Sequence, residues 1–206
     1  MGAYTWTFVR VDKLSKEQVE KVVTEAKQSA SLTTYGEYSK LPFKEALEEW
    51  FKFHEEERDY FIDECGVSPE ELTKEFLTRK LKTEMKAYRA KMRLYDKVLT
   101  GEMTLEEMLH KTHQLTGFCN DFYVIKRQGH YYVNLHCEIF RNYEYGEEEF
   151  HTVDALIDHC KSIKDESFMD YEDEKPQYRK WDDKIEEHVR NFYSKIGDDN
   201  FYVHFG

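Results

Sequence analysis

Hydrophobic and polar residues alternate along two parts of the chain, which is the pattern of β-strands with one buried face. The first is "AYTWTFVRV" near the start, and "NFYVHF" at the end is also expected to form a strand. Between them, "DFYVIKRQGHYYVNLHCEIF" has Gln128-Gly129 at its centre, which suits the two-residue loop of a β-hairpin. That loop places Val124 opposite Val133. A further short strand is expected at "EEEF".

Other parts of the chain repeat hydrophobic residues every three or four positions, as amphipathic helices do. Two long helices are predicted, from about Pro42 to Cys65 and from Pro69 to Leu99, joined by "CGVSPEE". Shorter helices are expected after the caps at Ser15 and Thr104, after Thr152, and from about Gln177 to Ile196, whereas "SLTTYGEYSKLP" is expected to be a loop.

These elements predict an α+β fold with a small, mainly antiparallel sheet built from the N-terminal strand, the central hairpin and the C-terminal strand. We expect a single α+β domain over residues 1–206. Residues 42–100 are expected to be a helical hairpin inserted within it.

Composition favours a packed protein that carries negative charge. Of 206 residues, 16% are aromatic, and the formal net charge is −12. Buried aromatic rings supply a large apolar core, and an acidic surface favours basic partners over nucleic acid or anionic membranes. No apolar run approaches the roughly 20 residues of a membrane span. The chain start lacks the basic, then apolar pattern of a signal peptide, so we expect a cytoplasmic protein with reduced cysteines.

The two long helices carry opposite charges. Residues 45–64 hold nine acids against two bases, and residues 79–97 hold eight bases against two acids. The favoured interpretation is an antiparallel helical hairpin with opposite charges along its seam. The alternative is nucleic-acid binding through the basic helix 79–97. The residues expected to contact the phosphates are Lys82, Lys86, Arg89 and Arg93. A helix of this length also suits a homodimer.

A second acidic region interleaves carboxylates with aromatic residues. Six of the ten residues from Asp165 to Glu174 are acidic. Such a segment serves as a solvated linker or docks onto a basic, partly apolar surface. The predicted partner-binding residues are Glu55, Glu56, Asp59, Asp165, Glu166, Phe168, Met169, Asp170, Tyr171, Glu172, Asp173 and Glu174.

Candidates for chemistry are few. The hairpin register sets Asp121 opposite His136, either as a base oriented by a carboxylate or as a cross-strand polar pair; the second is favoured. His110 and His113 share a helix face, with Cys119 nearby, but a zinc site needs further ligands. No phosphate loop or catalytic motif is present, and no cofactor is predicted.

These observations favour a non-enzymatic binding or regulatory protein. Its acidic, aromatic-rich surface is expected to engage a basic protein, one that itself handles nucleic acid, in the manner of an accessory or phage-type inhibitor from a mobile element. Two alternatives stay open: a small cytoplasmic enzyme built on the Asp121–His136 pair, and nucleic-acid binding through the basic helix.

Overall fold

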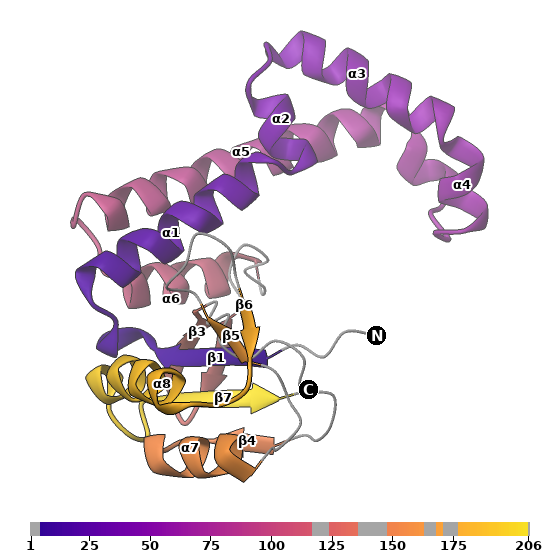
Figure 1. Ribbon diagram of the computed structural model, residues 1–206. Coiled ribbons are helices and arrows are strands. Elements are labelled where there is room, and N and C mark those ends of the chain that lie inside the picture. The colour runs from indigo at the N-terminus through magenta and orange to yellow at the C-terminus, as the bar shows by residue number, and fades with distance from the viewer. Residues whose placement is uncertain (1–4, 117–123, 136–147, 163–167, 171–176, 206) are drawn as a thin grey trace. The chain divides into compact units, whose positions relative to one another are not determined.

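The computed structural model of the chain describes residues 5–116, 124–135, 148–162, 168–170 and 177–205. The chain divides into two compact units (Figure 1). We call residues 1–22 and 113–206 the sheet unit, and residues 23–112 the helical unit. The predicted α+β class is confirmed. That the chain is one domain with an insertion at 42–100 stays a prediction.

The sheet unit is built on five antiparallel strands in the order β2-β3-β1-β7-β4. Strands β1 and β7 pair at its centre, with Phe8 opposite Tyr202, and β4 supplies the short strand expected at "EEEF". The bounds are Thr5–Arg10 for β1, Val124–Arg127 for β2, His130–Asn134 for β3, Glu148–Phe150 for β4 and Phe201–Phe205 for β7.

The central hairpin has the predicted register. Val124 lies opposite Val133 and Arg127 lies opposite His130. The loop residues Gln128 and Gly129 both have positive φ, 50° and 85°. A two-residue loop with left-handed backbone at both positions matches the right-handed twist of the strands, which is why these two residues fix the register.

Helices α7 (Val153–Ser162) and α8 (Asp183–Ile196) belong to the sheet unit. The Tyr193 ring of α8 packs on Phe201 of β7 with centroids 4.6 Å apart. Its hydroxyl forms a buried hydrogen bond of 2.8 Å with the Thr7 hydroxyl of β1. One face of the sheet is therefore packed against α8.

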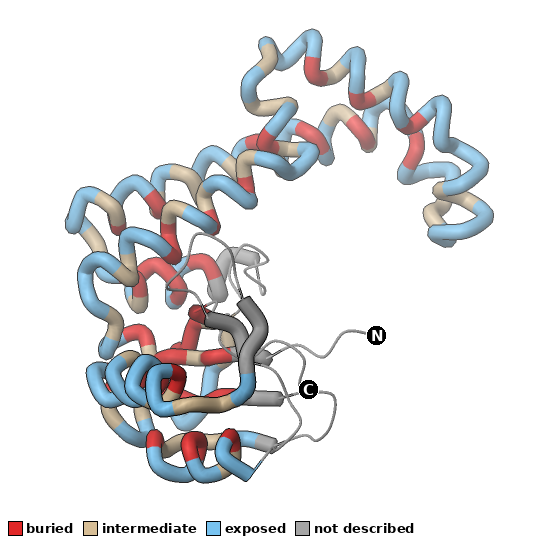
Figure 2. Tube along the Cα trace, in the orientation of Figure 1, coloured by how far each residue is buried: buried red, intermediate tan, exposed pale blue. Residues whose placement is uncertain are grey.

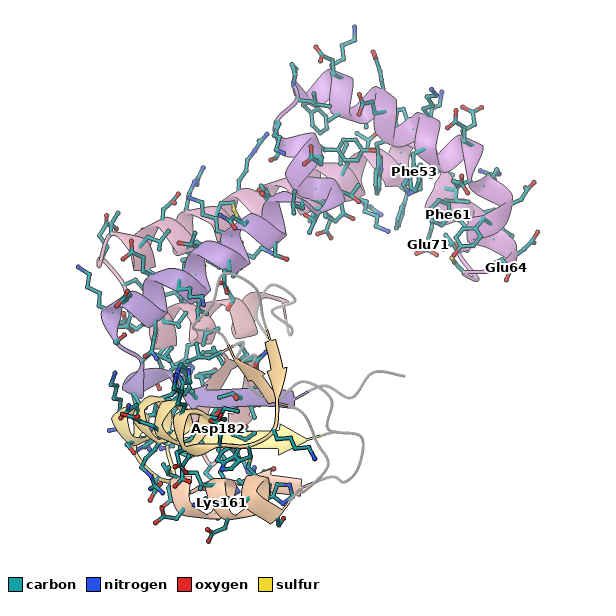
Figure 3. All side chains as sticks on the ribbon, viewed as in Figure 1. Phe53, Phe61, Glu64, Glu71, Lys161 and Asp182 are labelled. Carbon is teal, nitrogen blue, oxygen red and sulfur yellow. The ribbon has the colours of Figure 1, made fainter. Side chains whose placement is uncertain are left out.

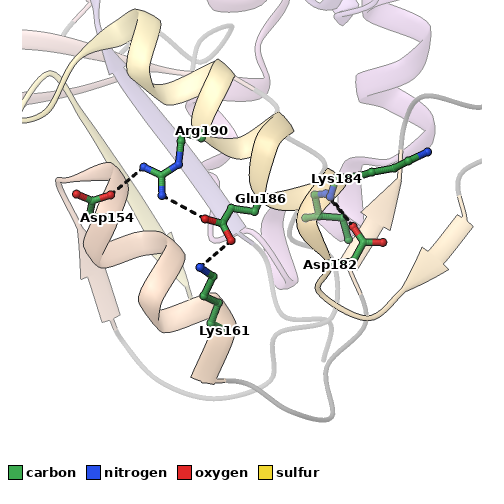
Figure 4. A network of polar contacts seen from close by, with 7 residues as sticks. Asp154, Lys161, Asp182, Lys184, Glu186 and Arg190 are labelled. Carbon is green, nitrogen blue, oxygen red and sulfur yellow. Dashed lines mark hydrogen bonds and ion pairs between the residues drawn. The ribbon is translucent and has the colours of Figure 1, made fainter.

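A chain of ion pairs joins α7 to α8 (Figure 4). Arg190 of α8 contacts Asp154 at 2.9 Å and Glu186 at 3.2 Å. Glu186 also accepts a hydrogen bond from Lys161 of α7 at 2.7 Å, and this contact lowers the pKa of Glu186.

Asp182 caps α8, since its carboxylate accepts from the backbone N–H groups of Lys184 and Ile185.

In the helical unit, α3 and α5 lie side by side and antiparallel (Figure 1), which confirms the predicted hairpin. A row of buried residues fills the seam between them (Figure 2): Ala46, Trp50, Leu77, Leu81 and Met85. The elements are α2 (Thr34–Ser39), α3 (Phe43–Glu56), α4 (Arg58–Asp63), the 3-10 helix η2 (Pro69–Leu72) and α5 (Lys74–Leu99).

Helices α1 (Lys16–Ser31) and α6 (Leu105–Thr116) each have residues in both units, and a 3-10 turn η1 (Val11–Lys13) precedes α1. Both begin at the predicted capping boxes. The Ser15 N–H donates to the Gln18 side chain at 2.8 Å, and the Thr104 N–H donates to Glu107 at 2.8 Å.

Several boundaries differ from the expectation. The helix predicted over 42–65 ends at Glu56 and restarts at Arg58, and the next long helix begins at Lys74 instead of Pro69. The predicted loop after α1 contains α2. Two short strands, β5 (Phe168–Asp170) and β6 (Gln177–Arg179), pair antiparallel, and β6 lies where the last helix was expected to begin.

Candidate functional site

The end of the helical unit is a compact turn built by α3, α4 and η2 (Figure 3). Three consecutive glutamates, Glu55 to Glu57, stand where α3 ends. Negative charge there opposes the helix dipole, which favours termination. Gly66 then takes a left-handed conformation, φ 65°, and the Val67 N–H donates to the Phe61 carbonyl at 2.9 Å. The chain is thereby turned back towards α5.

A stack of rings supports this turn from within. The His54 ring lies 3.9 Å from the Trp50 ring and 4.9 Å from the Phe61 ring, centroid to centroid. His54 is 7% exposed, and its Nδ1 bonds the Trp50 carbonyl at 2.9 Å. Burial lowers the pKa of His54, and the nearby Lys80 of α5 acts in the same direction. His54 is therefore a packed core histidine, as its place on the apolar stripe indicates.

Two aromatic side chains of the same turn face outward. Phe53 is 43% exposed and Tyr60 is 56% exposed, and both contact Phe61, at 5.7 and 6.0 Å between centroids. Exposed acids share this end of the unit: Glu55, Glu56, Glu57, Asp59, Asp63, Glu64, Glu70 and Glu71. We call residues 52–71 the acidic tip; it holds eight acids and two bases.

The acidic tip brings together three of the predicted partner-binding residues, Glu55, Glu56 and Asp59, all exposed. Of the second predicted group, Phe168, Met169 and Asp170 lie in β5 of the sheet unit. Asp165, Glu166, Tyr171, Glu172, Asp173 and Glu174 lie outside the described residues.

Sequence reasoning did not single out Phe53 and Tyr60 as surface residues. A signal was available, since neither belongs to the stripe of residues that marks the inner face of the helix. An aromatic residue that lies off the apolar stripe of an acid-rich helix is expected to be exposed on the surface.

The predicted basic residues Lys82, Lys86, Arg89 and Arg93 are all exposed on α5. The ion pairs that α3 forms lie within the helix, from Lys44 to Glu48 at 3.9 Å and from Lys52 to Glu56 at 3.7 Å. The seam between the helices is accordingly held by apolar residues, and charge pairing along it stays a prediction. The apolar face of α5 from Leu77 to Met85 packs in one core with Ala46 and Trp50 of α3, inside the helical unit.

The predicted Asp121–His136 pair lies outside the described residues. The polar face of the hairpin can be followed through Arg127, whose guanidinium forms an ion pair with Glu149 of β4 and lies over the Tyr202 ring, 5.3 Å from its centroid. Glu149 also contacts the imidazole of His151 at 2.8 Å. Hydrogen bonding to Glu149 raises the pKa of Arg127, while burial raises the pKa of Tyr202.

This face thus carries an Arg–Glu–His cluster on aromatic side chains, Tyr132 and Tyr202, whose rings lie 5.0 Å apart. The cluster could not be foreseen from the hairpin alone, because Glu149, His151 and Tyr202 come from distant parts of the sequence. The Glu149 carboxylate contacts both Arg127 and His151, and its pair with Arg127 joins β4 to the hairpin.

Only part of the predicted zinc site lies within the described residues. His110 is exposed on α6, His113 lies one turn further along that helix, and Cys119 lies outside the described residues. Across the described part of the chain, no three or more His, Cys, Asp or Glu side chains are grouped as metal ligands would be. Among the thiols, Cys160 is buried, and burial raises its pKa to about 12, whereas Cys65 of the acidic tip is exposed.

Comparison with known proteins found no matching family model, no similar curated protein and no similar solved structure. No helix in the described ranges is both long and apolar enough to cross a lipid bilayer.

Proposed function

We propose that the chain is a non-enzymatic, cytoplasmic binding protein that engages a basic protein partner through the acidic tip, in the manner of a phage or mobile-element inhibitor. The observation that carries this proposal is the exposure of Phe53 and Tyr60, 43% and 56%, among eight exposed acids. Aromatic residues at the centre of an interface supply much of its binding energy.

The acids and the aromatic residues have different tasks in such an interface. Carboxylates steer a basic partner towards the tip and speed association, with an effect that salt weakens. The rings of Phe53 and Tyr60 then lose their contact with water when they insert into apolar pockets of the partner. A partner of this chemistry has a basic surface with apolar pockets, as proteins that handle nucleic acid have.

The acidic tip is also suited to binding because its inner side is fixed. His54 and Phe61 are stacked beneath the exposed rings, and Ser68 and Glu71 close a capping box at the start of η2. Side chains that are already ordered lose less conformational entropy on association.

The test is affinity capture from the native host with the wild type and three variants, followed by mass spectrometry. The first variant is Phe53→Ala with Tyr60→Ala, and the second is Glu55→Gln, Glu56→Gln and Asp59→Asn. A matched control neutralises three exposed acids of the sheet unit, Glu20→Gln, Asp158→Asn and Glu187→Gln. Circular dichroism confirms that all forms are folded.

We expect the wild type and the control to retain the same basic protein in stoichiometric amount. Loss of an aromatic anchor costs about 2 kcal/mol of binding free energy, roughly 30-fold in affinity. The aromatic variant should therefore fail to retain the basic protein. The acid variant should associate more slowly and depend less on salt. Equal retention by all four forms would refute the proposal.

A further inference from the structure

Helix α5 carries a row of positive side chains on one side. Its members recur every three or four residues and are all exposed: Arg79, Lys82, Lys86, Arg89, Arg93 and Lys97. At 100° per residue they fall within an arc of about 80° of the helix. The buried residues Leu77, Leu81 and Met85 point to a different side, towards α3. We call the six residues the basic stripe.

The basic stripe is not neutralised by its surroundings. In the part of the chain that the structure describes, none of the six side chains forms an ion pair, although Arg79 lies 5.3 Å from the centroid of the Phe76 ring. Of the three acids of α5, Glu75 stands on the same side as the stripe, one turn before Arg79, and the other two face residues of neighbouring helices. Asp96 is engaged by Lys27 of α1, and Glu84 lies near Tyr35 of α2, where burial raises the pKa of that phenol and the charge of Glu84 adds to the effect.

The spacing of the stripe suits a regular row of negative charges. A step of three or four residues along a helix is about 5–6 Å, so the six cations extend over about 27 Å. Phosphates along a nucleic-acid strand are also regularly spaced, and Lys and Arg are their usual partners. The planar guanidinium groups of Arg89 and Arg93 can each bind a phosphate through two hydrogen bonds.

The stripe lacks most of the side chains that distinguish bases: Lys and Arg can contact guanine, but they bind the phosphate of any nucleotide. It contains no aromatic side chain on which a base could stack, as single-strand binding surfaces do, and no Asn or Gln for base edges. The regular phosphate backbone of a duplex is therefore the ligand that fits it best. From these features we propose that α5 binds the phosphate backbone of a nucleic-acid duplex, without sequence preference, through the basic stripe.

The net charge of −12 weakens such binding but does not abolish it. At 0.1 M salt, charges more than about 10 Å apart are largely screened, so a bound phosphate responds mainly to the charges beside it. Between Arg79 and Lys97 there are eight bases and two acids. The proposal is independent of the acidic tip and adds a second ligand class, one that a nucleic-acid-handling partner would bring with it.

The test is fluorescence anisotropy with labelled 25-base-pair DNA and RNA duplexes and a single strand of the same length, in 25 to 200 mM salt. The full chain is compared with a stripe variant, Lys82→Gln, Lys86→Gln, Arg89→Gln and Arg93→Gln. A matched control removes four exposed lysines of the sheet unit: Lys13→Gln, Lys16→Gln, Lys184→Gln and Lys195→Gln. Both variants have the same net charge, so only the position of the lost cations differs.

We expect the wild type to bind both duplexes with dissociation constants on the order of 10–100 μM at low salt, in the range of non-specific binders. Each phosphate contact contributes about 0.9 to the slope of log K against log salt, so the stripe variant should bind at least tenfold more weakly with a flatter slope. The control should lose much less affinity. The acidic-tip variants should bind duplex as the wild type does, which separates this result from the fate of the proposed function.

Three outcomes overturn the proposal. The first is an absence of wild-type binding at 25 mM salt. The second is equal loss in the stripe variant and the control, which reports net charge alone. The third is displacement of the duplex by poly-glutamate at equal charge concentration, which assigns the stripe to acidic proteins instead.

Discussion

The rings of His54 and Phe61 are stacked, with centroids 4.9 Å apart and planes inclined by only 12°. The contact joins the last turn of α3 to α4 across the break at Glu57. His54 belongs to the buried core that supports the acidic tip. Phe61 contacts both exposed rings of the tip, those of Phe53 and Tyr60. A titratable group in this place makes the tip sensitive to pH.

We expect the helical unit to lose stability as the pH falls below about 6.5. Burial lowers the pKa of His54 from its ordinary value of 6.5, so the unfolded chain binds a proton more readily than the folded one. Its contribution is therefore complete above 6.5 and is lost as the pH falls towards the lowered value. The measurement is urea unfolding of the wild type and His54→Phe between pH 5 and 8.

The phenylalanine variant keeps a ring in the stack but cannot titrate, so its stability should fall less than that of the wild type over this range. His188→Gln, at an exposed position of α8, is the control and should follow the wild type. Parallel curves for the wild type and His54→Phe would show that the imidazole does not titrate in the folded tip.

Gly36 of α2 is expected to tolerate no larger residue. A Cβ atom there would lie 2.5 Å from the Ser31 carbonyl oxygen and 2.6 Å from that of Ala30, and both are backbone atoms at the end of α1. Gly36→Ala should lower the free energy of unfolding by about 1–3 kcal/mol, as overpacking does, despite the better helix propensity of alanine.

The matched control for this substitution is Thr34→Ala, at an exposed position of the same helix. It should change stability by less than about 0.5 kcal/mol. Chemical denaturation followed by circular dichroism measures both. A Gly36→Ala protein as stable as the control would mean that α2 can move away from α1 at no cost.

The sequence predicted those elements whose formation is decided locally. The hairpin register follows from Gln128-Gly129, because few residues accept left-handed backbone at adjacent positions. The caps at Ser15 and Thr104 follow from pairs of side chains three residues apart. Helix α2 was missed because its six residues gain little from propensity. Its place beside α1 depends on the absence of a side chain at Gly36, which no periodic pattern reveals.

The candidate site was predictable in its charge and not in its shape. The acids of residues 45–64 are evident in the sequence, and Glu55, Glu56 and Asp59 do share a surface. The outward position of Phe53 and Tyr60 depends on the end of α3 at Glu56 and the restart at Arg58. A continuous helix over 42–65 would have set α4 on a different line, so the pattern alone could not place these rings.

Trp50 provides a test of the packing beneath the tip. It is 5% exposed, and its indole N–H is buried without a hydrogen-bond partner in the described structure. An unsatisfied buried donor costs about 1–3 kcal/mol. Phenylalanine removes that donor and keeps a ring between Tyr38 and His54, at the expense of a smaller side chain. Trp50→Phe should therefore change the free energy of unfolding by less than about 1 kcal/mol.

Trp50→Ala, by contrast, should destabilise the protein by about 3–5 kcal/mol, because it leaves a cavity in the seam between α3 and α5. The difference between the two variants separates the contribution of the ring from that of the N–H group. Urea denaturation at pH 7.5 measures both, since His54 is then neutral and does not add to the change. If Trp50→Phe were as destabilising as Trp50→Ala, the indole N–H would have to contribute a favourable interaction that its surroundings do not supply, and the packing described for the seam would be wrong.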